Sequence, residues 1–241
     1  SDETMDKAAQ TAADLGVGCH IHTAEARSDQ EFNQSRFGLR VVERLHRHGV
    51  LGPKSIAAHC VHVDGRELDL LAESGTAVAH NPQSNLNNAV GIADILAMDR
   101  KGILVGLGTD AMTVNMREEV RVALWAQHLR HDNPGVGFVE TLSTLLFHNA
   151  RIANRYWECG LGELKEGGAA DVVLIDYIPP TPLDESTFLG HFAFGITQAP
   201  VDTTIAGGRV LMAGKQLLLD IDEEEVCRKS RELAARLWDR F

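Results

Sequence analysis

The chain has 241 residues, with 34 Asp and Glu against 23 Lys and Arg and a formal net charge of −11 at pH 7. This acidic balance argues against nucleic acid and anionic membrane surfaces as partners, because phosphate binding depends on a surplus of Lys and Arg. No apolar run approaches the roughly 20 residues that cross a bilayer, and the polar first residues carry no secretory signal. We therefore expect a soluble globular protein.

The four cysteines lack the CxxC spacing of metal or redox motifs; they are Cys19, Cys60, Cys159 and Cys227. Scattered cysteines of this kind are typical of free thiols in a reducing compartment. We expect free, mostly buried thiols and a cytoplasmic location.

Residues 1–157 alternate between helical and strand-like segments. Apolar periodicity and end signals, such as Asp64 before and Gly75 after one apolar run, predict six helices. They cover residues 1–16, 37–52, 64–75, 91–102, 115–131 and 138–156, and the predicted strands cover 17–22, 55–62, 76–82 and 103–110. Strands that alternate with helices predict βα units and a parallel sheet. Four such units make half of an eight-stranded barrel, a fold of the α/β class.

The character of the sequence changes near residue 158. Two β-like runs with Gly-rich turns, 161–177 and 201–219, predict part of a small β domain over residues 158–221. The Pro-rich stretch 179–188 between them is expected to be a loop. The tail, residues 222–241, has an acidic start and a basic end that suit a closing helix.

Polar side chains cluster where the four predicted strands end. The first two strands deliver His22, Glu25, His59 and His62, and the last two deliver His80, Asn81 and Asp110. The carboxyl ends of parallel barrel strands form one face, which is where active sites of such barrels are built. We therefore expect these side chains to share one rim.

Imidazole and carboxylate groups on one rim point to metal-assisted hydrolysis. A catalytic divalent metal takes such ligands and keeps a position for water, whose pKa it lowers toward about 7. A carboxylate that is not a ligand can then move the proton. In this interpretation His22 and Asp110 are ligands and Glu25 is the proton shuttle. His20 could be a second ligand, but we expect it to pack one layer deeper.

The sequence resembles the amidohydrolase superfamily in the motifs "HTAE", "AAHCVH", "HNPQSN" and "LGTD", which lie in that order. The branch that it resembles holds the cytosine, guanine and S-adenosylhomocysteine deaminases and the chlorohydrolases. The stretches "HNPQSNLNNAVG", "DYIPPTPL" and "GHFAFG" bring it nearest to the aminohydrolases called SsnA. The resemblance implies the C-terminal half of a (β/α)₈ barrel, from its strand five to its strand eight, plus part of a composite β-sandwich.

The resemblance also implies roles for the rim residues. His22 matches a metal ligand, Glu25 the general acid and base, and His59 the histidine that polarises the attacked centre. Asp110 matches a second metal ligand that helps to accept the water proton. The substrate pocket is implied at His80, Asn81, Ser84 and Asn85, with His62 expected either at the substrate or on the surface. The implied cofactor is one divalent ion, zinc in preference to iron, and the implied reaction is hydrolytic deamination of a purine-like or pyrimidine-like heterocycle.

Two departures from the family pattern leave alternatives open. Ala111 follows Asp110 where the family commonly has Gly, and no HxH pair precedes His20, so the ligands of the first barrel strand are absent from this sequence. The leaving group could also be chloride or an amide. The chain could instead be an inert fragment or interaction module, whose open barrel edge pairs with the missing half or with another copy.

Overall fold

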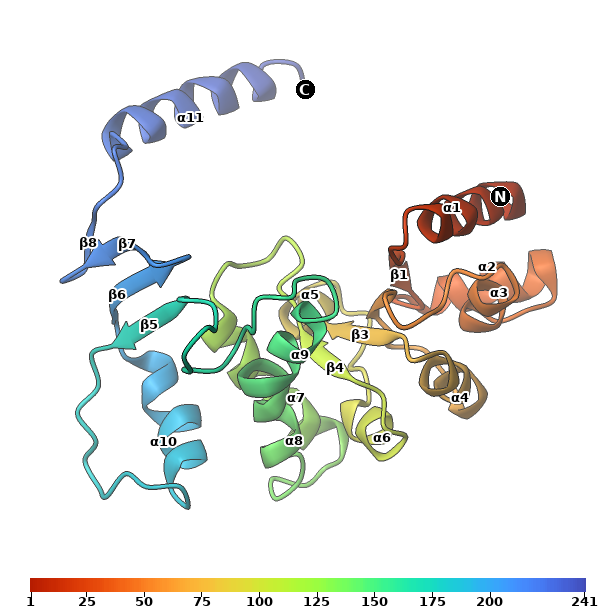
Figure 1. Ribbon diagram of the computed structural model, residues 1–241. Helices are drawn as coiled ribbons and strands as arrows, with labels where there is room; N and C mark the ends of the chain where they lie inside the picture. The colour runs from red at the N-terminus through yellow and green to blue at the C-terminus, as the bar shows by residue number, and fades with distance from the viewer. The chain divides into compact units, whose positions relative to one another are not determined.

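The computed structural model describes residues 1–241 as two compact units (Figure 1). The first unit comprises residues 1–169 and 177–199, and the second comprises residues 170–176 and 200–241. The helices of the first unit are α1 (Asp2–Asp14), α2 (Arg27–Phe37), α3 (Val41–Arg47), α4 (Gly65–Ser74), α5 (Pro82–Asn87), α6 (Ile95–Arg100), α7 (Met116–Arg130), α8 (Phe138–Ser143), α9 (Asn149–Ala153) and α10 (Phe188–Phe194).

A four-stranded parallel sheet forms the centre of the first unit. Its strands follow the chain in order, β1 (His20–Thr23), β2 (Ile56–His59), β3 (Ala77–His80) and β4 (Val105–Leu107). All three neighbouring pairs are parallel. The prediction of four βα units is thereby confirmed, and the strands are shorter than their predicted spans. Since every connection leads to a parallel neighbour, all four carboxyl ends lie at the same edge of the sheet.

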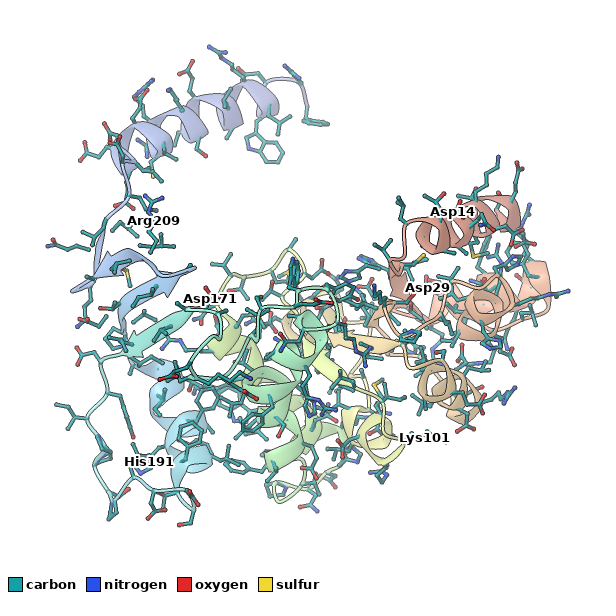
Figure 2. All side chains as sticks on the ribbon, in the orientation of Figure 1. Asp14, Asp29, Lys101, Asp171, His191 and Arg209 are labelled. Carbon is teal, nitrogen blue, oxygen red and sulfur yellow. The ribbon has the colours of Figure 1, made fainter.

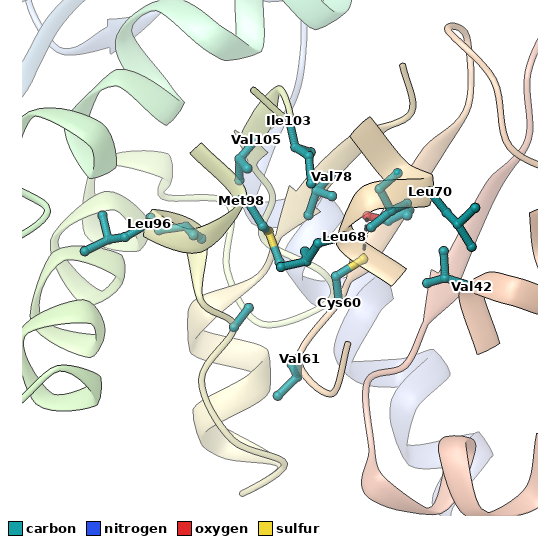
Figure 3. Close-up of a cluster of buried hydrophobic side chains, with 14 residues drawn as sticks. Val42, Cys60, Val61, Leu68, Leu70, Val78, Leu96, Met98, Ile103 and Val105 are labelled. Atoms are coloured by element: carbon teal, nitrogen blue, oxygen red, sulfur yellow. Dashed lines mark hydrogen bonds between the residues drawn. The ribbon is translucent and has the colours of Figure 1, made fainter. Parts of the chain in front are cut away.

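The main apolar core joins the sheet to the helices that follow its strands (Figure 3). Val78 and Val105 from the strands lie in one buried cluster with Leu71 of α4 and Met98 of α6. Val42 brings α3 into the same cluster. Burial of side chains of this size stabilises the fold by roughly 1.5–3 kcal/mol each. This core fixes the sheet and with it the positions of the strand ends.

A second core lies between α7, α8 and α10. Leu124 of α7 and Leu142 of α8 pack in one buried cluster with Phe192 of α10. His191 of α10, labelled in Figure 2, lies 2.6 Å through its Nδ1 from the Tyr177 hydroxyl. These contacts explain why residues 177–199 group with the first unit, whereas the composition shift near residue 158 placed them with the β domain. Neither α10 nor the short helices α2 and α5 was expected.

The outer edge of β4 is bonded by side chains rather than by a further strand. A π-helix, Thr144–His148, interrupts the predicted helix 138–156, and His148 bonds through its Nδ1 to the Val105 carbonyl oxygen (2.9 Å). The Asn149 side chain accepts from the Leu107 N–H (2.8 Å) and donates to the Leu107 carbonyl oxygen (3.0 Å). A Cβ on Gly106 would lie 2.5 Å from Asn149 Oδ1, so this close approach requires glycine. The expected open edge is therefore partly closed on this side.

The second unit contains an antiparallel sheet in the order β5 (Val172–Ile175), β6 (Val201–Ala206), β7 (Arg209–Ala213) and β8 (Gln216–Leu217), followed by α11 (Glu223–Trp238). Gly207 and Gly208 join β6 to β7 with φ values of +55° and +77°, the left-handed backbone of a two-residue hairpin turn. Asp171 accepts the Gly207 N–H at 2.6 Å and, like Arg209 beyond the turn, is labelled in Figure 2. An antiparallel sheet and a C-terminal helix thus lie within the range expected for them, but residues 158–169, which were expected in the β domain, group with the first unit.

All four cysteines are free, as expected, but only Cys60 is buried. Cys159 and Cys227 are exposed, so the expectation of mostly buried thiols was wrong. The reason is local, since Cys227 lies on α11, which has no buried residues. No helix of the protein combines the length and apolar character that a bilayer crossing requires.

Candidate active site

The rim at the carboxyl ends of the strands brings together the side chains that the sequence singled out. His22 lies within β1, and Glu25 lies two residues after the end of that strand. His59 and His80 are the last residues of β2 and β3, and Asp110 follows β4. Because the strands are parallel and adjacent, residues distant in the sequence converge at one edge of the sheet.

His22, Glu25 and His59 form a group that fits a metal ion. One ligand atom from each lies within 4.8 Å of the others. Glu25 Oε2 is 3.7 Å from His22 Nδ1 and 3.6 Å from His59 Nε2. Two imidazole nitrogens and a carboxylate oxygen are the donor types that zinc takes in catalytic sites. The donor set and its spacing therefore fit a divalent metal.

His59 is fully buried, and a neighbouring side chain binds one of its two ring nitrogens. Its Nδ1 lies 2.8 Å from Asn85 Oδ1, while its buried Nε2 has no hydrogen-bond partner within the protein. Since an amide oxygen only accepts, the proton of a neutral His59 sits on Nδ1, and Nε2 presents a lone pair. His59 also has φ +71°, an unusual backbone for a residue with a side chain. A lone pair without a partner in a buried position is what a metal or a reacting water requires.

Asp110 lies beside His59 at the outer end of the group. Its Oδ2 is 3.9 Å from His59 Nε2 and accepts a 2.7 Å hydrogen bond from Ser84 Oγ. The Ser84 hydroxyl is the main reason that the pKa of Asp110 lies below its usual range. Asp110 is consequently a carboxylate at neutral pH, although it is not one of the three residues within 4.8 Å of each other.

The two residues at the end of β3 are buried beneath this group. Burial lowers the pKa of His80 to about 4, with a smaller effect from His59, so its imidazole is neutral at pH 7. Neither ring nitrogen of His80 has a partner. Asn81 packs against the backbone that follows β4, where a Cβ on Gly108 would lie 2.3 Å from Asn81 Oδ1. His80 thus offers an uncharged imidazole with free hydrogen-bonding capacity.

His62 is turned toward the backbone of a neighbouring loop. Its Nε2 lies 2.7 Å from the Val90 carbonyl oxygen. Its own carbonyl oxygen accepts from Gln30 Nε2 (2.9 Å) and from the Arg40 guanidinium (2.8 Å). These bonds tie the loop after β2 to α2 and to the start of α3. His20, two residues before His22, does not belong to the ligand group, as expected, but it is exposed, so the expectation that it packs one layer deeper was wrong.

Two residues near the site were not anticipated. Asn88 Nδ2 approaches Glu25 Oε1 at 3.4 Å, from the C-cap of α5. Glu119 of α7 accepts the backbone N–H of Gln83 at 3.2 Å and is fully buried. The stretch "HNPQSNLNN" held the signal for Asn88, since it continues the motif by one helical turn. Glu119 carries no local signal, because only the packing of α7 on α5 brings it near the rim.

The parallel half-barrel and its rim of imidazoles and carboxylates define a class of metal-dependent barrel hydrolases. The chain belongs to the amidohydrolase family, whose profile matches residues 1–211.

Curated relatives match nearly the whole chain. The 5-methylthioadenosine/S-adenosylhomocysteine deaminase of Desulforudis audaxviator is 35% identical over 240 residues, which cover 97% of this chain and 55% of the relative. The enzyme of the same name from Dictyoglomus thermophilum is 33% identical over 238 residues, again 97% of this chain and 55% of the relative. The chain thus spans about half the length of the curated relatives it matches.

Solved structures share the fold. A zinc-bound adenosine deaminase from Xanthomonas campestris superposes with a TM-score of 0.87 at 24% identity, covering 99% of this chain and 55% of that one. The atrazine chlorohydrolase TrzN from Arthrobacter aurescens TC1, complexed with zinc, gives a TM-score of 0.81 at 25% identity, covering 97% and 52%. The predicted half-barrel with a partial sandwich is confirmed by these likenesses.

Proposed function

We propose that the rim of β1 to β4 is part of the active site of a metal-dependent aminohydrolase that removes an amino group from a purine-like heterocycle. The observation that carries the proposal is the Glu25 carboxylate, 3.6 Å from the free Nε2 of the buried His59 and 3.7 Å from His22. The names of the most similar curated relatives support an adenosine-derived substrate such as 5-methylthioadenosine or S-adenosylhomocysteine.

We assign His22 and Asp110 as ligands of one divalent ion, and we assign Glu25, which lies in the same group as His22, to proton transfer rather than to the ion. Further ligands would come from the half of the family fold that this chain does not span. Zinc is preferred to iron, because related folds hold zinc and the donor set suits it. When bound, such an ion activates water and acts as a Lewis acid. His22 and Asp110 alone would bind the ion more weakly than the complete set of ligands.

Glu25 moves the proton in the proposed reaction. Its side chain is 21% exposed, and its Oε2 faces both imidazoles. It takes a proton from the attacking water and delivers it to the departing amine, which leaves as ammonia. Asn88, 3.4 Å from Oε1, orients the carboxylate so that Oε2 faces the reacting atoms.

His59 and Asp110 support charge and water at the reacting centre. With Nδ1–H donated to Asn85, the Nε2 lone pair of His59 accepts from water or from a metal. The depressed pKa of Asp110 keeps it anionic, so it neutralises positive charge at the rim. We assign His80, Asn81, Ser84, Asn85 and the loop of His62 to the floor and wall of the substrate pocket.

A second candidate is hydrolysis of another leaving group, favoured by the structural likeness to a chlorohydrolase. In the deamination Glu25 protonates the departing amine, whereas in the alternative reaction the leaving group, such as chloride, departs as an anion. The zinc-loaded protein should be offered 5-methylthioadenosine, S-adenosylhomocysteine and a 6-chloropurine nucleoside, with ammonia and chloride measured separately. Ammonia from the first two supports the deaminase, and chloride alone supports the alternative. No product with any of them would support the reading of this chain as an inert module.

A further inference from the structure

Helix α5 carries two side chains that reach the rim, yet it has little means of its own to hold its position. It has six residues, whereas isolated helices shorter than about 12 residues are marginal. Its N-cap residue, Asn81, makes no side-chain capping bond, and Pro82 has no N–H to donate. Gln83 therefore supplies the first backbone donor of the helix.

That donor is met by a carboxylate from another helix. Glu119 Oε2 of α7 accepts the Gln83 N–H at 3.2 Å, and α5 packs on α7. The two residues after Gln83 are Ser84, bonded to Asp110, and Asn85, bonded to His59. The hydrogen bond at Gln83 is thus one residue from the Ser84–Asp110 contact and two residues from the Asn85–His59 contact.

Capping a helix with Glu119 lowers the stability of the fold. It is fully buried, and its second carboxylate oxygen has no partner in the protein. Burial raises its pKa to about 7, the Gln83 N–H opposes that change, and Glu118 adds to it. A buried carboxylate with one hydrogen bond costs stability that an apolar side chain would not. The contact accounts for positioning rather than for stability.

We infer that Glu119 is a positioning residue, which caps α5 through the Gln83 N–H and thereby holds Ser84 against Asp110 and Asn85 against His59. The catalytic benefit of this positioning rests on the proposed function of the rim, whereas the contacts from Glu119 to Gln83 and from α5 to the rim do not depend on it. Glu119 acts on the rim through α5 rather than on the reacting atoms.

The test uses the ¹⁵N-labelled chain without metal, so it does not depend on activity. E119M removes the acceptor while keeping the length of the side chain, and E118M is the matched control one residue earlier on α7. In the wild type and in E118M we expect His59 to carry its proton on Nδ1 and the Gln83 amide to exchange slowly. In E119M we expect a mixture of His59 tautomers and Gln83 exchange at least about tenfold faster.

Two further variants keep the test decisive. E119Q retains an acceptor oxygen and should restore both wild-type signals. E119D keeps the charge but is shorter by one methylene, and it should behave as E119M does, which covers the case that E119M does not fold. In an active metal-loaded protein, E119M should lower kcat about 10- to 100-fold with little change in KM. A folded E119M or E119D with the wild-type His59 tautomer and Gln83 protection overturns the inference, whereas a protein without deaminase activity overturns only the proposed function.

Discussion

Asn85 Oδ1 lies 2.8 Å from His59 Nδ1, and both side chains are buried. The pair joins α5 to the end of β2 and decides which nitrogen of His59 faces the rim. The lone pair on Nε2 is therefore a property of two residues rather than of His59 alone.

Replacement of Asn85 by Ala should leave His59 Nδ1 buried without a partner. An unsatisfied buried donor costs about 1–3 kcal/mol, so we expect the free energy of unfolding to fall by that amount in urea titrations. Asn87→Ala, at an exposed position of the same helix, should change it by less than about 0.5 kcal/mol. Equal losses in both variants would count against the pairing.

His22 and His20 lie two residues apart on β1 and offer a matched comparison for metal binding. His22 belongs to the ligand group, whereas His20 does not. His22→Ala should weaken zinc binding at least about tenfold in isothermal titration calorimetry, because it removes one of the few residues that coordinate the ion directly. His20→Ala should bind zinc as the wild type does. A loss of affinity in the His20 variant equal to that in the His22 variant would contradict the assigned ligand.

Glu25→Gln separates proton transfer from metal binding. The amide keeps the size of the side chain but cannot take the proton, so we expect deamination to fall by about 10²- to 10⁴-fold. Zinc content by mass spectrometry should not change, and Glu31→Gln on the exposed side of α2 should leave the rate unaltered. Retained deamination in the Glu25 variant would exclude it as the proton carrier.

Ser84→Ala removes the hydrogen bond that chiefly depresses the pKa of Asp110. A depressed carboxyl pKa favours the anion down to low pH, so its loss lets protons compete with the metal at higher pH. We expect the acid limb of zinc binding to move upward in pH and the affinity at neutral pH to drop about 10-fold. Competition with a chelator from pH 5 to 8 measures both, and Ser35→Ala serves as control.

Glu119 should make stability depend on pH in the neutral range. Its folded-state pKa of about 7 lies above the ordinary value of 4.5, so the folded protein holds the proton more tightly than the unfolded chain does. Stability from this group is present below the ordinary pKa and is lost as pH rises toward 7 and beyond. Denaturation of Glu119→Gln should show a stability gain over the wild type that grows between about pH 5 and pH 8. A constant difference across that range would refute the raised pKa.

The sequence predicted the rim because one rule suffices for it. In a parallel sheet, strand ends meet at one edge, so His22, His59 and Asp110 could be brought together from strand positions alone. The grouping of Glu25 with these histidines followed from the same rule. The roles given to the pocket residues came from the resemblance and remain predictions.

The supporting contacts could not be predicted in this way. Glu119 reaches α5 across a helix–helix contact, and no periodicity in α7 records which partner a buried carboxylate meets. The π-helix before Asn149 depends on the fit of that segment against β4, so the apolar pattern indicated one continuous helix. Helix α10 was missed because its few residues follow a Pro-rich loop, and its burial arises from α7 and α8.

The Asn149 amide imitates a neighbouring strand by meeting both the N–H and the carbonyl oxygen of Leu107. A strand whose outward backbone groups are already engaged is a poor template for another chain, and so this end of the sheet resists edge-to-edge aggregation. The Asn149 side chain thereby supplies, at this residue of β4, the two backbone hydrogen bonds that a neighbouring strand would supply.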